Sequence, residues 1–424
     1  MNKTLKESRE MKESGIEWIG QIPKTWEVIP NKYVMKKIKD ICIRYDNEDI
    51  LSLTMNGVII RDLDNPTGKM PTTFDGYQRL SKGNLLMCLF DIDVTPRCIG
   101  LINNNGLTSP AYSQFTLKNG NIAKYYYYYY LNLDFTKELL HLSKRNSLTE
   151  NLLGAVKVPR PPIHEQQAIA NYLDEQVGKI DELITEQRIA IEKWKEYKQS
   201  LITETVTKGL NPDVEMKDSG IEWVGEIPSN WETVFINQLF TQLKNKNTEM
   251  QETNLLSLSY GKIVRKNIET KEGLLPENFN GYNVINAGDI VLRLTDLQND
   301  QRSLRCGIAK ERGIITSAYV TLRNIKPLVN NYYYYLIHAY DIMKVFYGMG
   351  SGVRQGLTFD GLKKMRLLVP SIENQQQIAD FLDEKCSKID QTIEQKQVLI
   401  QQLEEYKQSL IYECVTGKRC VEER

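Results

Sequence analysis

Arginine and glutamine side chains near glycines and polar turns are the residues of this sequence that are best suited to bind a ligand. The most suggestive segment is 348–356, GMGSGVRQG, whose glycines allow close backbone approach; segment 143–146, SKRN, is its counterpart earlier in the chain. Arg, Lys, Asn and Gln are the side chains that hydrogen-bond to base edges in a DNA groove. The candidate base-reading residues are Arg61, Arg97, Lys144, Arg145, Asn146, Arg265, Arg293, Arg305, Arg354 and Gln355.

Each of these residues has a plainer alternative role. A surface arginine is more often solvated or ion-paired than bound to a base, and that reading stays open for every candidate. The tyrosine runs 125–130 and 332–335 could stack on bases. Their length and apolar flanks favour helix faces that pack on a sheet.

Catalytic motifs are incomplete or missing. The segment 348–356 lacks the GK[ST] ending of a phosphate-binding loop. The ExK-like triplets at 10–12 and 215–217 have no acidic residue on a preceding strand, and the N-P-P-[FY] signature of adenine methyltransferases is absent. The three histidines lie far from any cluster of cysteine or carboxylate at metal-ligand spacing. We therefore expect no catalytic, cofactor or metal site in this chain.

Composition and charge place the chain among globular proteins. Hydrophobic residues make up 41% and charged residues 25% of 424 residues, which is enough to bury several cores. The polar start, the absence of a long apolar run and seven scattered cysteines favour a reduced cytoplasm and no membrane span. The net charge is zero, yet segments 1–157 and 211–369 carry small positive surpluses while 158–210 and 370–424 are acidic.

The sequence is a tandem duplication of a unit about half its length. Residues 11–30, MKESGIEWIGQIPKTWEVIP, match residues 216–235, MKDSGIEWVGEIPSNWETVF. Residues 163–202 likewise match residues 372–411, both ending in EYKQSLI. The ends of each copy match closely, whereas the middles have drifted. Such a long period predicts two globular domains, each followed by a helix, and not a solenoid.

The middle of each copy mixes strand and helix signals. Short apolar runs at 84–90 and 289–294 follow glycines and predict strands, as do 112–117 and 319–323. The tyrosine-rich stretches 122–133 and 328–346 have the length of helices. Each domain is therefore expected to be α+β with a substantial sheet.

The end of each copy predicts a long helix. Pro161, Pro162 and Pro370 mark the expected starts, and Gly209 and Gly417 lie just past the expected ends, which places the first helix at 165–207. Apolar residues recur at alternating spacings of three and four, the pattern of a coiled-coil seam. We expect the two helices to pair with each other antiparallel; packing of each helix on its own domain, or on another copy of the chain, is the alternative. The seam residues are Ile169, Leu173, Val177, Ile180, Ile184, Ile191, Trp194 and Leu201 in the first helix, and Ile378, Leu382, Ile389, Ile393, Ile400, Leu403 and Leu410 in the second.

These motifs resemble one known family. The pattern K-[DE]-S-G-I-E-W-[IV]-G-x-I-P-x-x-W, then P-x-x-x-Q-x-x-I-A-x-[FY]-L-D and K-I-D, occurs twice and is similar to that of the specificity subunits of type I restriction-modification systems. The resemblance covers essentially the whole chain. It implies target recognition domains at 1–157 and 211–369, and spacer helices at 158–210 and 370–424.

The resemblance also implies a function and partners. Each recognition domain would read one half of a bipartite, asymmetric DNA site, and the helices would set the spacing and dock two modification subunits. Those subunits would use S-adenosylmethionine, and restriction subunits would add an ATP- and Mg-dependent nuclease. Two other classes remain as alternatives: a DNA-modifying or DNA-cleaving enzyme with two recognition modules, and a coiled-coil interaction protein without DNA binding.

Overall fold

The computed structural model describes residues 9–66, 71–143, 145–248, 250–268, 278–297, 304–349 and 356–421. Its contacts divide the chain into two units. The first unit joins Met1–Gln187 to Gln397–Arg424, and the second is Arg188–Lys396. Each unit therefore contains one globular domain together with parts of both long helices, α4 (Ile163–Lys208) and α7 (Ile372–Val415).

The globular part of the first unit is α+β, as expected. Its strands are β1 (Met11–Glu13), β2 (Gln21–Pro23), β3 (Glu27–Pro30), β4 (Met35–Ile38), β5 (Leu51–Thr54), β6 (Gly57–Ile60), β7 (Gln78–Leu80), β8 (Leu85–Met87), β9 (Ile99–Leu101), β10 (Gly106–Thr108), β11 (Ser113–Leu117) and β12 (Lys157–Arg160). Its helices are η1 (Asn31–Tyr33), α1 (Ala123–Phe135), α2 (Glu138–His141) and α3 (Glu150–Ala155).

The second unit repeats this order element by element. Its strands are β13 (Met216–Asp218), β14 (Glu226–Pro228), β15 (Glu232–Phe235), β16 (Phe240–Gln242), β17 (Leu256–Ser259), β18 (Lys262–Arg265), β19 (Asn283–Ile285), β20 (Ile290–Leu292), β21 (Cys306–Ile308), β22 (Gly313–Ile315), β23 (Val320–Asn324) and β24 (Arg366–Val369). Its helices are η2 (Ile236–Gln238), α5 (Asn330–Ile342), η3 (Val345–Gly348) and α6 (Phe359–Leu362).

The largest sheet of each unit has the same topology. It has four antiparallel strands in the order β4-β11-β8-β9 in the first unit and β16-β23-β20-β21 in the second. The strands predicted at 84–90, 112–117, 289–294 and 319–323 are its central members. The drifted middles of the two copies therefore build one fold, and the duplication is structural as well as sequential.

The tyrosine runs lie in α1 and α5, which pack on β9 and β21. Tyr125, Tyr129 and Tyr332 are fully buried. Burial raises the pKa of each of these phenols, because the anion would lose its hydration. The preference for helix faces over base-stacking platforms is confirmed for these positions.

Each globular domain is held by both long helices. In the first unit, Tyr125 Oη donates a 2.9 Å hydrogen bond to the carbonyl of Val415, at the end of α7, and Tyr128 Oη donates to Asp174 of α4 at 2.9 Å. In the second unit, Tyr332 donates to the carbonyl of Val206 at the end of α4, and Tyr335 donates to Asp383 of α7.

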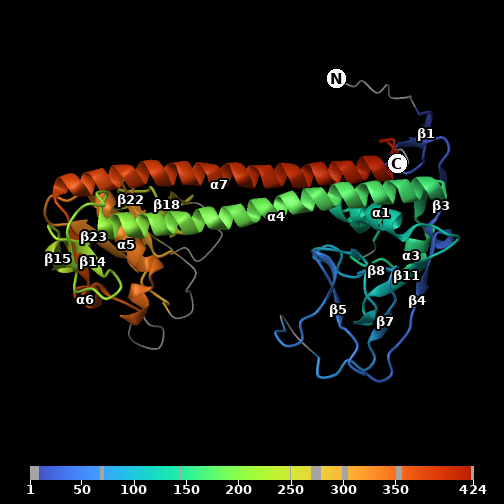
Figure 1. Cartoon of the computed structure of the whole chain (residues 1–424), viewed down its shortest axis with the longest axis horizontal. Coiled ribbons are helices and arrows are strands. Elements are labelled where there is room, and N and C mark those ends of the chain that lie inside the picture. Colours follow the sequence, from blue (N-terminus) through green and yellow to red (C-terminus); the bar gives the residue numbers. More distant parts are fainter. Residues whose placement is uncertain are drawn as a thin grey trace. The chain divides into compact units, whose positions relative to one another are not determined.

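Within each unit the segments of α4 and α7 lie side by side and run antiparallel (Figure 1). Lys407 Nζ lies 2.6 Å from Asp181 in the first unit, and Lys198 Nζ lies 2.6 Å from Asp390 in the second. These two ion pairs occupy equivalent positions of the repeat. The seam residues named from the sequence are all buried or half-buried.

Two glycines at the helix ends are required by geometry. Gly209 and Gly417 follow α4 and α7 with φ values of 78° and 73°, the left-handed conformation that ends a helix. A Cβ at Gly417 would lie 2.4 Å from Pro23 Cδ and 3.0 Å from the Trp26 ring. The glycine therefore lets the end of α7 contact the tryptophan of the first domain.

A matched pair of alanine substitutions tests this contact. Gly417→Ala should lower the free energy of unfolding by more than about 1 kcal/mol, because a side chain there is strained and collides with Pro23. Gly178→Ala, at an open position within α4, should raise it by up to about 1 kcal/mol. Denaturant unfolding of both variants measures the difference. Equal effects of the two substitutions would contradict this account.

Candidate nucleic-acid interface

Two surface segments meet in each globular domain and carry most of the candidate residues. In the first domain, the loop between β8 and β9 contacts the turn before α3. Ile92 N donates to the carbonyl of Asn146 at 3.1 Å, and Asn146 Nδ2 donates to Asp93 at 2.8 Å. In the second domain, Leu357 N donates to the carbonyl of Leu294 at 2.9 Å, which joins the segment before α6 to the loop between β20 and β21.

Arg145 and Asn146 form the tip of the first-domain turn. Both are exposed, and both have positive φ, at 52° and 59°. The contacts of Asn146 place this turn beside the loop between β8 and β9. Lys144, Arg354 and Gln355 lie outside the described residues.

A buried aspartate fixes the base of each loop. Asp134 of α1 accepts a 3.0 Å hydrogen bond from the backbone N–H of Cys98, and Asp341 of α5 accepts from the backbone N–H of Arg305. Burial raises the pKa of Asp341, since little water reaches it. These aspartates position the loops and do not reach the surface.

Arg305 is a structural residue, which corrects its place among the base-reading candidates. It is fully buried, and its guanidinium donates to the carbonyls of Thr295 and Asp296 at 2.8 and 3.1 Å, and to Tyr347 Oη at 3.1 Å. A guanidinium whose donors hold loop carbonyls has none to offer a base edge. Arg305 therefore shapes the loop after β20 from inside.

Arg97 is also largely withdrawn from the surface. Its side chain is 11% exposed, and Nε lies 3.7 Å from Asp134 Oδ2. The guanidinium also lies over the Phe135 ring, 5.3 Å from its centroid. The ion pair and the ring hold Arg97 against α1, so its reach toward a ligand is short.

The remaining arginines lie nearer to solvent. Arg265 is 72% exposed, but Glu311 binds it through two hydrogen bonds and raises its pKa. Arg61 and Arg293 are half-exposed, and each makes further interactions within the protein. The structure thus groups Arg145 and Asn146 with the β8–β9 loop and Arg293 with the β20–β21 loop. Arg61 follows the β5–β6 hairpin, and Arg265 is the last residue of β18.

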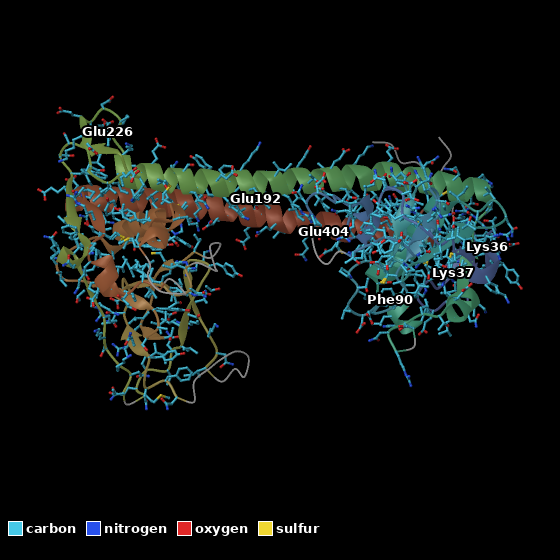
Figure 2. All side chains as sticks on the ribbon, turned by 90° about the horizontal axis from the view of Figure 1, so that it is seen from below. Lys36, Lys37, Phe90, Glu192, Glu226 and Glu404 are labelled. Atoms are coloured by element: carbon cyan, nitrogen blue, oxygen red, sulfur yellow. The ribbon has the colours of Figure 1, made fainter. Side chains whose placement is uncertain are left out.

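Sequence reasoning missed the exposed aromatic side chains. Tyr260, at the tip of the β17–β18 hairpin, is 82% exposed. Phe90, in the β8–β9 loop, is 37% exposed; Figure 2 labels it on the first domain. Phe90 stacks on Tyr112, with ring centroids 6.2 Å apart. The tyrosine–glycine pair at 260–261, between two strand-like runs, was the signal that could have identified the first of these.

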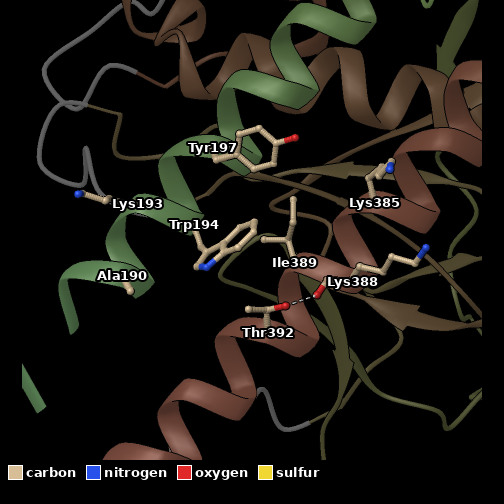
Figure 3. A pocket seen from close by; sticks show the side chains of 8 residues that line it. All are labelled: Ala190, Lys193, Trp194, Tyr197, Lys385, Lys388, Ile389 and Thr392. Carbon is tan, nitrogen blue, oxygen red and sulfur yellow. Dashed lines mark hydrogen bonds between the residues drawn. The ribbon is translucent and has the colours of Figure 1, made fainter. Parts of the chain in front are cut away.

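The second unit also has an apolar groove between α4 and α7, of about 570 Å³. Trp194 of α4 and Ile389 of α7 point toward each other at its floor, and Lys193, Lys385 and Lys388 line its rim (Figure 3). Within the described residues, no group of histidine, cysteine, aspartate and glutamate side chains is arranged to hold a metal ion. No helix of the described part has the length and apolar content to cross a membrane.

The two halves match where the helices dock on the domains and differ where loops meet solvent. Such an arrangement is typical of a binding protein that arose by duplication and has two homologous domains. The chain belongs to the type I restriction modification DNA specificity domain family, whose model matches residues 99–193 and 228–405. The DNA-specificity role follows from this membership, and it agrees with the resemblance seen in the sequence.

Individual relatives agree with the family. The chain is 24% identical over 421 residues to the putative type I restriction enzyme MjaX specificity subunit of Methanocaldococcus jannaschii, covering 94% of this chain and 95% of that relative. It is 24% identical over 335 residues to the MjaVIII specificity subunit of the same organism, covering 75% of each. A chain solved in work on complex assembly and conformational transition of the type I R-M system has the same fold. Its TM-score is 0.67 at 12% identity, with coverage of 94% of this chain and 99% of that one.

Two arginine substitutions test the division between structural and surface residues. Arg305→Met should lower the free energy of unfolding by about 3 kcal/mol, because the loop carbonyls lose their buried donors. Arg265→Met should change it by at most about 1 kcal/mol, since an exposed ion pair contributes little. Urea denaturation followed by tryptophan fluorescence measures both. A larger loss for Arg265→Met would show that the assignment is reversed.

Proposed function

We propose that each recognition domain reads one half of a bipartite, asymmetric DNA site, and that the spacer helices set the gap between the halves. The main support for this proposal is that the two copies agree in their helix-docking residues and differ in their loops. Equivalent tyrosines and aspartates dock equivalent helices, whereas equivalent loops carry different side chains. In a symmetric dimer both surfaces are identical and read a palindrome. Duplication within one chain lets the two surfaces diverge.

We propose that the functional division is into recognition domains 1–157 and 211–369 and spacer segments 158–210 and 370–424. The candidate DNA contacts that the structure leaves accessible are Arg145 and Asn146 in the first domain and Arg293 in the second. Arg61, which follows the β5–β6 hairpin, and Arg265, the last residue of β18, would contact the phosphate backbone. Lys144, Arg354 and Gln355 remain candidate DNA contacts on the basis of the sequence alone.

Two copies of one modification subunit would dock on the helices. Exposed apolar side chains recur at equivalent positions of the repeat: Tyr197 and Tyr406 are 51% and 50% exposed, and Ile189 and Val398 are 53% and 48% exposed. Paired apolar positions on two similar surfaces favour two similar partners. Those partners would bring S-adenosylmethionine and adenine chemistry, and restriction subunits would add ATP- and Mg-dependent cleavage in the cytoplasm.

Partner dependence of methylation is the first test. The purified chain with S-adenosylmethionine and duplex DNA should give no methyl transfer, and addition of the modification subunit should give methylation at adenine. Mapping of the methylated adenines should yield two unequal half-sites with a fixed gap. Methyl transfer by this chain alone would support the rival enzyme. Absence of salt-dependent DNA binding by the assembled complex would support an interaction protein without DNA binding.

Spacer length is the second test. One heptad is added to α4 between Asp181 and Lys198 and one to α7 between Asp390 and Lys407, so that both ion pairs keep their partners. Seven residues lengthen a helix by about 10 Å, so the gap should grow by about three base pairs. Both half-site sequences should stay unchanged. Methylation mapping in cells measures the gap, and a changed half-site or an unchanged gap would refute the spacer role.

A further inference from the structure

The tip of the β17–β18 hairpin holds an aromatic residue in a conformation that disfavours it. Ser259 pairs with Lys262, so the turn consists of Tyr260 and Gly261, with φ values of 45° and 78°. Two residues with positive φ form the turn that matches strand twist, and Asn-Gly is its preferred sequence. A side chain as large as tyrosine is strained there.

The strain is accompanied by exposure. Tyr260 is 82% exposed, more than any other aromatic side chain in the described ranges. A residue that gains no burial and strains the backbone adds nothing to the fold. Strained residues of this kind occur where function requires the side chain.

The surroundings of the tip suit a polyanion. Residues 253–268 contain Lys262, Arg265 and Lys266 and no aspartate or glutamate. Lys262 and Lys266 are exposed, whereas the charge of Arg265 is offset by Glu311. An exposed aromatic ring can pack against base edges in a groove while flanking lysines hold the phosphates.

The hairpin tip also lies beside the candidate loop of the second domain. A Cβ at Gly261 would come within 3.0 Å of the Leu304 side chain and 3.6 Å of the Cys306 carbonyl, at the end of the β20–β21 loop. Arg293 begins the same loop, and its N–H donates to the Arg305 carbonyl at 2.9 Å. The hairpin tip and the backbone of Arg293 therefore both border the end of the β20–β21 loop.

The first domain has a different tip at the same place. There the turn residues are Met55 and Asn56, positive φ falls on Gly57 instead, and residues 51–60 carry no charge. The same hairpin thus ends in different chemistry in the two copies. Divergence at a shared position is what two readers of different sequences require.

We propose that Tyr260 is a DNA-contacting specificity residue of the second recognition domain, its ring packing into the groove of that half-site against a base. The inference rests on the proposed half-site reading and adds to it a residue outside the arginine set. Asparagine would suit this turn better than the tyrosine that is present, so the fold does not explain Tyr260 and DNA recognition does.

Tyr260→Asn tests the proposal in the complex of the full chain with its modification subunit. Asparagine suits the turn, so the midpoint of thermal unfolding should stay unchanged or rise. Affinity for a duplex carrying the mapped site should fall by about fivefold to about 150-fold, the range for losing the contact to one base pair of a site. Tyr260→Phe, which keeps the ring, should retain most of the affinity.

Scrambled duplexes locate the effect. Two duplexes, each with one half-site scrambled, are compared with the intact site by fluorescence anisotropy. Tyr260→Asn should lessen discrimination at one half-site only, and Met55→Asn, at the equivalent position of the first domain, should leave that half-site unaffected. Unchanged affinity and discrimination for Tyr260→Asn would overturn the inference, as would weaker assembly with the modification subunit, which sedimentation measures. Failure of the unsubstituted complex to discriminate any duplex would instead refute half-site reading itself.

Discussion

The docking of a tyrosine-rich helix between two long helices is the interaction on which the structure depends. Tyr125 reaches the last turn of α7, and Tyr128 reaches the first turns of α4. The second unit repeats both contacts with Tyr332 and Tyr335. A buried tyrosine ring supplies a large apolar area, and the hydrogen bond of its hydroxyl sets its position, so these four tyrosines both stabilise and orient the packing. Each unit therefore needs both copies of the repeat, although its globular part comes from only one.

The long helices and the central strands could be predicted from the sequence, because they depend on the local spacing of apolar residues. The first helix was expected to end at 207 and ends at Lys208, because proline and glycine mark both ends and the apolar spacing is regular. The central strands of the large sheets were found for a similar reason. The sequence could not show that one helix end docks on the domain of the other copy, since that contact joins residues as distant as Tyr125 and Val415. Both the pairing of the helices and their packing on domains occur, although they were posed as alternatives.

The candidate site was harder to predict, because exposure is a property of the fold. Arg97 and Arg305 stand in polar, loop-like sequence, yet α1 and α5 bury them. The acceptors of Arg305 are loop carbonyls that converge only once β20 and β21 pair. Tyr260 was passed over for the opposite reason. A lone tyrosine in a short apolar run predicts a buried strand residue. The glycine that follows it is the turn signal in the sequence, and the register of the hairpin places both residues in the turn.

The two kinds of position follow different physical demands. Residues that dock the helices are buried, hydrogen-bonded and repeated, so a change in one copy would cost stability without altering what is recognised. Hairpin tips and loop ends are exposed, and substitution there changes stability little. Asp134 and Asp341 hold the bases of the β8–β9 and β20–β21 loops, which lets other residues of these loops vary while the loops stay in place. A rigid repeated frame with variable tips is the arrangement that allows two halves of one chain to acquire separate sequence preferences while both keep the same fold.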